Sequence, residues 1–212
     1  MLPFARRVDH MPRQHDTRSR ARDEFGRRLA EFGYLGVSLD EIAKAVDVKK
    51  ASLYHHFPGG KPALFREVAF AHIEEASAIL RESLAVPDTI RGQLVALVAS
   101  YARGVYNSTL SDQIYRATRY LDETQRAEIS HAYVRGLIEP VADLMATAIA
   151  AGELRQADPG FLATAVMELA ATAVPVPTDL AMPPSLRCTP QPVDQLIQDI
   201  VDLFLRGAAS DR

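Results

Sequence analysis

The amino-acid sequence predicts an all-α protein made of a small N-terminal domain and a larger C-terminal domain. Two short helical patterns joined by a tight turn lie between Ser38 and Lys61. From Lys61 nearly to the C-terminus, apolar residues recur at helical spacing, with interruptions at proline and glycine. A chain of 212 residues with 48% hydrophobic content can hold one small and one mid-sized helical domain.

The first helix is expected from Thr17 to Phe32, with Asp16 or Thr17 as its N-cap. Its core-facing stripe would consist of Ala21, Phe25, Leu29 and Phe32. Residues 1–16 predict a disordered arm, within which Met11 is an alternative to Met1 as the true start.

The segment from Ser38 to Lys61 predicts a helix-turn-helix. Ser38, with Glu41 three residues later, forms a capping-box pattern. The helix that follows has an apolar face of Leu39, Ile42, Ala43 and Val46. Asp47 stands at the turn, because Asp tolerates left-handed backbone angles better than most residues. The second helix, 50–57, is polar apart from a buried edge of Leu53 and Phe57.

Several sequence blocks point to one known family. They are Phe32-Gly33-Tyr34, Ser38-Leu39-Asp40-Glu41-Ile42-Ala43, Leu53-Tyr54-His55-His56-Phe57, and then Lys61 and Leu64. With them, the stretch from about Arg18 to Val68 resembles the DNA-binding domain of the TetR family of transcriptional regulators. The resemblance implies a regulator, and more specifically a repressor that a small-molecule effector releases from its operator.

The sequence departs from the family pattern around the turn. Asp47 stands where the family usually has glycine, and Ala51 also replaces a usual glycine. Lys49 occupies the place of a small hydroxyl residue that caps the second helix. We therefore expect that helix to lack its cap, a loss that costs on the order of 1 kcal/mol.

The resemblance also implies which residues would contact duplex DNA. Phosphates would be bound by Lys49, Tyr54, His55, His56 and Lys61, and by backbone N–H groups at Ser38 and Leu39. Base edges would be met by Lys50, Ala51 and Ser52, because a lysine can donate to guanine and an alanine methyl can pack on thymine. One short helix-turn-helix reads few bases, so we expect a homodimer on a palindromic operator with half-sites about 34–36 Å apart, or a multiple.

Charge is distributed unevenly along the chain. The net charge is −3, but residues 1–61 hold 12 Lys/Arg and 8 Asp/Glu, whereas residues 62–212 hold 12 and 19. A basic N-terminal part on an acidic body suits phosphate binding at one end, although a solvated basic face would look the same. The arm arginines Arg6, Arg7 and Arg13 would either reach along the duplex or belong to an idle tail, which we favour.

The predicted domains are 17–60, which binds DNA, and 61–212, which binds effector and dimerises. In the second domain, helices are expected at 61–84, 88–107, 111–121, 124–151, 159–174 and 193–207. Pro140 lies inside one of them and cannot donate to the carbonyl of Gly136, so a kink is expected there. The Pro-rich residues 175–192 predict a long loop.

The last two expected helices carry more apolar surface than a terminal pair should expose. They either pack within the chain or, as the resemblance implies, form a four-helix dimer interface from Phe161, Ala165, Leu169, Leu196, Ile200 and Phe204. The middle helices would hold the effector in a pocket. Its candidate residues are Tyr101, Tyr106, Tyr115, Arg116, Arg119 and Tyr133. The sequence does not identify the effector.

No motif indicates an enzyme, because the sequence contains no glycine-rich phosphate loop, G-x-S-x-G or H-E-x-x-H. Adjacent His55 and His56 would diverge by about 100° on a helix, so we expect no metal site and no cofactor. The single cysteine, Cys188, fits a reducing cytoplasm. Neither a membrane span nor a signal peptide is indicated, and we expect a cytoplasmic protein. Two alternatives remain: a ligand-independent DNA-binding regulator, and a helical small-molecule-binding protein with a vestigial DNA head.

Overall fold

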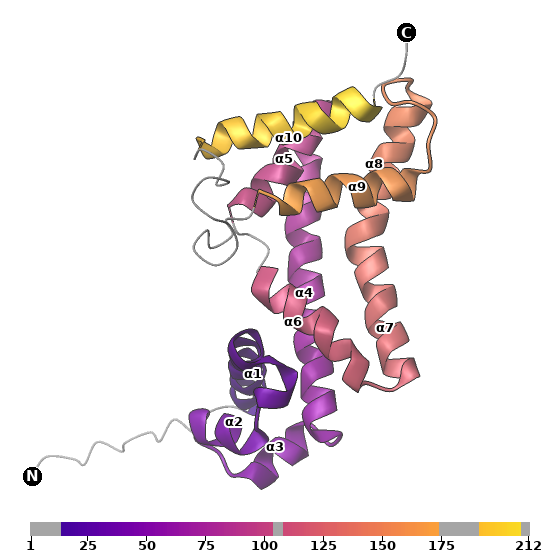
Figure 1. The fold of residues 1–212 in the computed structure, drawn as a ribbon. Coiled ribbons are helices and arrows are strands. Elements are labelled where there is room, and N and C mark those ends of the chain that lie inside the picture. Colours follow the sequence, from indigo (N-terminus) through magenta and orange to yellow (C-terminus); the bar gives the residue numbers. More distant parts are fainter. Residues whose placement is uncertain (1–13, 104–107, 174–190, 209–212) are drawn as a thin grey trace, which may run out of the picture. The chain divides into compact units, whose positions relative to one another are not determined.

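The computed structural model describes residues 14–103, 108–173 and 191–208, and all secondary structure in these ranges is helical (Figure 1). The prediction of an all-α protein is confirmed. The chain divides into two compact units, Met1–Val68 and Ala69–Arg212, and the division falls within one helix, α4 (Gly60–Ala85). The predicted domain boundary after residue 60 coincides with the start of that helix, and its functional meaning stays a prediction.

Unit 1 consists of α1 (Gln14–Gly36), α2 (Leu39–Ala45), α3 (Lys50–His56) and the first turns of α4. Every one of these elements supplies apolar side chains to a common core. The largest fully buried ones are Phe25, Leu29, Ile42, Leu53, Leu64 and Phe65. Close packing of side chains from four helices lets a domain of this size bury a core, although α2 and α3 are each only seven residues long.

Helix α1 is longer than the expected 17–32 helix and is broken at Gly33, whose backbone angles are φ 68° and ψ 171°. Only glycine adopts this region readily. The expectation that Phe32 lies in the core is wrong, because its side chain is 53% exposed. After the break the chain instead buries Tyr34, whose ring packs edge-on against Phe65 with centroids 5.3 Å apart.

Unit 2 continues α4 and adds the remaining helical segments. They are α5 (Ile90–Ala102), α6 (Ser108–Ala117), the 3₁₀ turn η1 (Thr118–Tyr120), α7 (Glu123–Tyr133), the π-helical turn η2 (Val134–Ile138), α8 (Glu139–Ala150), α9 (Pro159–Ala171) and α10 (Val193–Ala208). Helix α9 packs on α8 and α5, and α10 packs on α5 and α9, so both lie crosswise to α8 (Figure 1). No helix in the described ranges is long and apolar enough to cross a membrane.

The helix expected at 124–151 contains the wide turn η2 just before Pro140, and the kink predicted at Pro140 stays a prediction. The N–H of Glu139 bonds to the carbonyl of Val134, five residues back, and Pro140 then lies in the first turn of α8. A proline is tolerated there because its missing N–H would be unpaired in any case. Most of the predicted 1–16 arm and of the 175–192 loop, and Tyr106 with them, lie outside the described residues.

We predict that Gly33→Ala destabilises the protein by about 1–3 kcal/mol, because alanine is strained at these backbone angles. The matched control is Gly207→Ala in α10, where an added Cβ meets no atom within 4 Å. That change should stabilise by roughly 0.5–1 kcal/mol, since alanine favours helix. Urea unfolding followed by circular dichroism measures both, and equal effects of the two substitutions would contradict the expected strain at Gly33.

Candidate functional site

The residues that the sequence assigns to DNA all lie on unit 1, on the outer side of α3 and in the segments next to it. The structure places each of them at an exposed or half-buried position: Ser38, Leu39, Lys49, Lys50, Ala51, Ser52, Tyr54, His55, His56 and Lys61. The opposite side of α3 is anchored by Leu53, which is fully buried. The polar face of α3 is therefore available to a ligand, and its contacts with DNA stay a prediction.

The turn between α2 and α3 is built by the sequence around Asp47. The N–H of Val48 bonds to the carbonyl of Ala43 at 2.9 Å, and the N–H of Asp47 bonds to that of Lys44 at 3.2 Å. These two bonds form a Schellman motif, which requires a left-handed residue after the helix. Asp47 takes that role with φ 56° and is the only non-glycine residue with positive φ in the described part of the chain. The predicted left-handed turn is confirmed.

The two helices of the motif begin differently. The hydroxyl of Ser38 accepts a hydrogen bond from the N–H of Asp40 at 3.3 Å and so caps α2. The Glu41 carboxylate of the expected capping box accepts a bond from Arg28 Nη1 at 2.8 Å. Helix α3 has Lys49 at its N-cap without a side-chain bond, as the sequence predicts.

Lys50, a predicted base reader, forms an ion pair within the unit. Its Nζ lies 2.9 Å from Oδ2 of Asp40, and both side chains are about half exposed. The hydrogen bond and the charge of Asp40 raise the pKa of Lys50, so the lysine stays protonated. Sequence reasoning missed Asp40 as a partner, because the two residues are ten apart and meet only through the geometry of the turn.

Glycine at position 60 brings Tyr54 close to the start of α4. A Cβ there would lie 3.3 Å from Tyr54 Cε1, and the backbone has φ 63°. The next residue, Lys61, has its Nζ 4.5 Å from the ring centroid of Tyr34, and burial lowers the pKa of this lysine. Gly60 thus lets Tyr54 approach the start of α4, where Lys61, another predicted phosphate ligand, follows directly.

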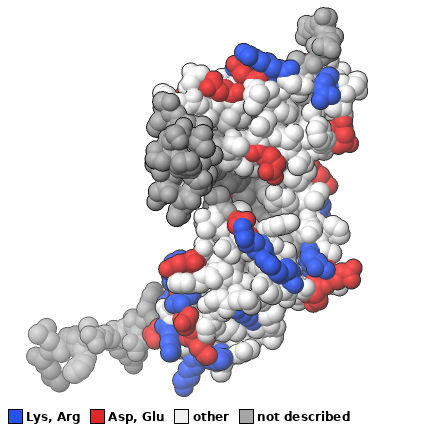
Figure 2. Space-filling view, viewed as in Figure 1, with Lys and Arg blue, Asp and Glu red and all other residues white. Residues whose placement is uncertain are grey.

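Arginines of α1 are mostly neutralised within unit 1. Arg27 and Arg28 both bond to Glu24, and the bond from Arg27 lowers the pKa of Glu24 to about 2, against the effect of burial and with the help of Arg28. Arg18 pairs with Glu67, and its guanidinium lies 5.5 Å from the Phe57 ring centroid. On the face drawn in Figure 2, basic and acidic side chains accordingly alternate over this unit. The lysines around α3 are therefore stronger candidates for phosphate than the α1 arginines.

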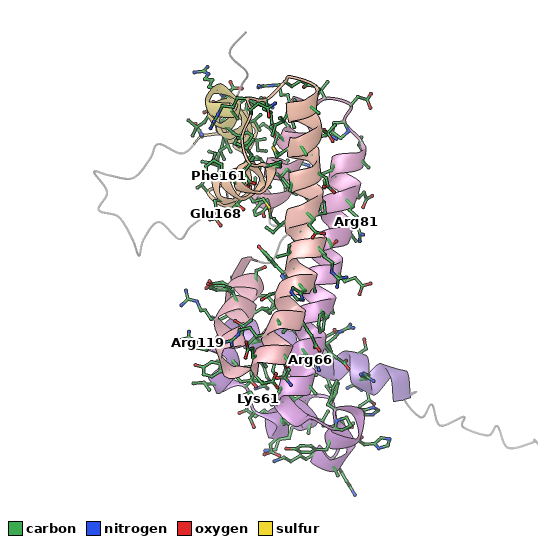
Figure 3. The ribbon with its side chains drawn as sticks, turned by 90° about the vertical axis from the view of Figure 1, so that its right-hand side faces the viewer. Lys61, Arg66, Arg81, Arg119, Phe161 and Glu168 are labelled. Atoms are coloured by element: carbon green, nitrogen blue, oxygen red, sulfur yellow. The ribbon has the colours of Figure 1, made fainter. Side chains whose placement is uncertain are left out.

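Unit 2 contains a cavity of about 1500 Å³ between α4, α6, η1, α7, η2 and α9. Five of the six predicted effector residues line it: Tyr101, Tyr115, Arg116, Arg119 and Tyr133. They come from α5, α6, η1 and α7, and Figure 3 labels Arg119 just after α6. The structure thus brings these residues together, and their role in binding stays a prediction.

The cavity is also lined by His72, Arg126 and Glu168, which the sequence analysis did not predict. His72 donates to or accepts from Ser111 Oγ at 2.7 Å, and burial lowers its pKa while Glu75 opposes that shift. Arg126 lines the wall three residues before Ile129 and seven before Tyr133, a helical spacing that could have revealed it. Glu168 of α9 carried no such signal, because it meets the cavity only through the crossing of the helices. No group of three His, Cys, Asp or Glu among the described residues could hold a metal ion.

The residues predicted to dimerise fall into two groups. Phe161 is 61% exposed, and Ala165, Leu169 and Leu196 are half-buried. Ile200 and Phe204, by contrast, lie inside the core of unit 2 and are only 6% exposed, and their part in dimerisation stays a prediction. Helix α10 turns these two toward its own chain because its apolar stripe is wide, and it exposes Leu203 instead.

Comparison with known proteins gives two family matches. A family model of the bacterial tetR regulatory proteins matches residues 26–68, and a model of the C-terminal domain of AefR-like transcriptional repressors matches residues 99–207. A curated relative is the biofilm operon icaADBC HTH-type negative transcriptional regulator IcaR of Staphylococcus aureus. It is 59% identical over 33 residues, which are 16% of this chain and 18% of that protein.

Solved structures share the fold at low sequence identity. PfmR of Thermus thermophilus, a TetR family regulator, is 21% identical with a TM-score of 0.67, over 91% of this chain and all of that one. A tetR-family regulatory protein of Rhodococcus is 17% identical with a TM-score of 0.72, over 92% and 98%. AibR, solved in complex with isovaleryl coenzyme A and operator DNA, is 19% identical with a TM-score of 0.65, over 88% and 97%.

We predict that Lys49→Ser stabilises unit 1 relative to Lys49→Ala by about 0.5–2 kcal/mol, because serine supplies the missing N-cap bond of α3. Both variants lose the same charge, so their difference isolates the cap. Thermal unfolding and hydrogen exchange of the α3 amides measure it. Equal stability of the two variants would show that the missing N-cap bond of α3 does not reduce the free energy of unfolding.

Proposed function

The chain belongs to the TetR family of transcriptional regulators, which are DNA-binding regulators rather than enzymes, and we propose that it is a homodimeric repressor released from a palindromic operator by a small-molecule effector. The observation that carries the proposal is the pairing of a complete helix-turn-helix, with its polar face outward, with a large cavity in the other unit. The first element would bind DNA, and the second would bind the effector.

In the proposed complex α3 enters the major groove. Lys49, Tyr54, His55, His56 and Lys61, with backbone N–H groups at Ser38 and Leu39, would bind phosphates, and Lys50, Ala51 and Ser52 would meet base edges. Support comes from the exposure of these side chains and from the buried Leu53 that fixes α3 in the unit. The internal pairing of the α1 arginines supports a site centred on α3.

Dimerisation would supply the second half-site. A helix of seven residues contacts few bases, and a twofold axis doubles the sequence read. Phe161 on α9 and Leu203 on α10, which are 61% and 62% exposed, support an apolar contact between copies. We propose that these residues, with Ala165, Leu169 and Leu196, form the dimer contact.

Helix α4 would transmit the effect of ligand binding in the cavity to the DNA-binding unit. It contributes Leu64 and Phe65 to the core of unit 1, and His72, Ile73 and Leu80 to the cavity wall of unit 2. A ligand that favours one position of this helix over another would change the spacing of the two recognition helices and so the affinity for the operator. AibR, a structural neighbour solved with both a small molecule and operator DNA, supports the combination.

The proposal is tested by binding of the purified protein to duplex DNA from upstream of its own gene, against random duplex, at two salt concentrations. We expect selective binding that weakens with salt, because phosphate contacts release counterions. Absence of any selectivity at either salt, together with binding of a small molecule in the cavity, would favour a small-molecule-binding protein with a vestigial head.

We predict that Tyr54→Phe weakens binding to operator and random duplex alike, because the hydroxyl would bond a phosphate, which carries no sequence information. Lys50→Ala should instead lower the ratio of operator to random affinity, because Lys50 would donate to guanine. Fluorescence anisotropy with both duplexes measures the two ratios. An equal loss on both duplexes for Lys50→Ala would refute base reading by this lysine.

We predict that Asp40→Asn strengthens operator binding roughly two- to fivefold at low salt, because it frees Lys50 from an exposed ion pair. Asp23→Asn is the matched control, since Asp23 is an exposed carboxylate of the same unit that pairs with Arg22. In the Lys50→Ala background the gain from Asp40→Asn should shrink toward that of the control. A gain that persists in that background would show that only net charge matters.

A further inference from the structure

We infer that the cavity of unit 2 takes an organic anion with an extended apolar body, and that Arg119 and Arg126 hold its anionic group. The inference rests on the proposed function in treating this cavity as the effector site, and it adds the chemical class of the effector. Three observations carry it: the arrangement of charges in the wall, the apolar surface beyond them, and the size of the space.

The arginines of the wall all lie between residues 116 and 126 of the chain. Arg116 belongs to α6, Arg119 to η1 and Arg126 to α7, which are consecutive elements. Arg116 is neutralised by Asp112, with Nε and Oδ2 2.8 Å apart. Arg126 forms no ion pair with any acidic residue that the structure describes. The part of the wall that α6, η1 and α7 contribute therefore has a surplus of positive charge.

Arg119 is oriented by its own surroundings. Its Nε donates to the carbonyl of Arg116 at 2.9 Å, and its guanidinium lies 5.6 Å from the ring centroid of Tyr120. These contacts use one N–H and one face of the guanidinium, so the two terminal nitrogens can still donate to an anion. A guanidinium is suited to this task, because its parallel N–H groups bind carboxylate or phosphate oxygens in pairs.

The remaining carboxylate of the wall, Glu168, would determine which way round the ligand binds. It belongs to α9, and Figure 3 shows it well apart from Arg119. An anionic group would be repelled at the α9 end and attracted at the η1–α7 end. His72 is a weaker partner for an anion than the arginines, because burial lowers its pKa and favours the neutral ring.

The apolar body of the ligand would lie along α4, η2 and α9. This part of the wall presents Ile73, Ala76, Leu80, Leu137, Ile138 and Met167. The cavity of about 1500 Å³ exceeds the roughly 300–1,000 Å³ usual for sites of drug-sized ligands. A long chain or several rings, rather than a small polar acid, would fill it and bury apolar surface on both sides.

The test uses three probes with one ten-carbon chain and different head groups: decanoate, decan-1-ol and decylamine. Their binding to the purified full chain is measured by isothermal titration calorimetry at two salt concentrations. We expect decanoate to bind about tenfold or more tightly than decylamine, because a charged hydrogen bond contributes to binding and like charges repel. The preference should shrink as salt rises.

Variants assign the preference to named side chains. Arg119→Gln and Arg126→Gln should each weaken decanoate by about tenfold and leave decan-1-ol unchanged, because only a charged hydrogen bond is lost. Arg81→Gln is the matched control: this exposed arginine of α4 lies outside the cavity wall and away from Arg119 (Figure 3). Glu168→Gln should widen the preference for decanoate over decylamine, because it removes a carboxylate that repels the anion and attracts the amine.

Three results would overturn the inference. Decylamine binding as tightly as decanoate would exclude an anion-selective site, and so would arginine variants that behave as Arg81→Gln does. Both would leave an effector cavity and DNA binding standing. If none of the three probes binds, this inference and the effector part of the proposed function both fail. Duplex binding of the same preparation then separates a ligand-independent regulator from a protein that has lost its fold.

Discussion

The structure depends on one helix that must satisfy two hydrophobic cores at once. The N-terminal turns of α4 bury Leu64 and Phe65 with the helices of unit 1, while Ala76 and Leu80 belong to the core of unit 2. Close packing leaves little freedom on either side, because a shift of a few tenths of an ångström already costs contacts. Helix α4 is therefore shared by the two cores, and coupling between the cavity and α3 stays a prediction.

In unit 1, acidic side chains neutralise much of the positive charge that the basic residues supply. The excess of basic residues in the first 61 positions suggests a broadly positive surface, but Glu24, Glu41 and Glu67 neutralise arginines of α1. Among the lysines beside α3, Lys50 is shared with Asp40. Exposed pairs of this kind are weak, so a phosphate or a base can replace the carboxylate at small cost.

Local physics was predictable from the sequence, and long-range geometry was not. The left-handed turn at Asp47 and the missing cap at Lys49 follow from the backbone preferences of single residues. The exposure of Phe32 and the burial of Phe204 depend on how a helix end or a wide apolar stripe meets its neighbours. For the cavity, five lining residues could be predicted from the sequence. Glu168 could not, because it reaches the cavity wall only through the way α9 crosses its neighbours.

The π-helical turn η2 is the place where a local backbone preference shapes the cavity wall next to α4. Gly136 within η2 approaches α4 so closely that an added Cβ would lie 3.3 Å from Ile73 Cγ2 and 3.3 Å from Ser77 Cβ, and Leu137 beside it lines the cavity. A wide turn normally costs stability relative to a regular α-helix. Pro140 reduces that difference, because a regular helix would leave the carbonyl of Gly136 without its usual donor in any case. The sequence thus lowers the energetic cost of an irregular helix at the place where the cavity wall meets α4.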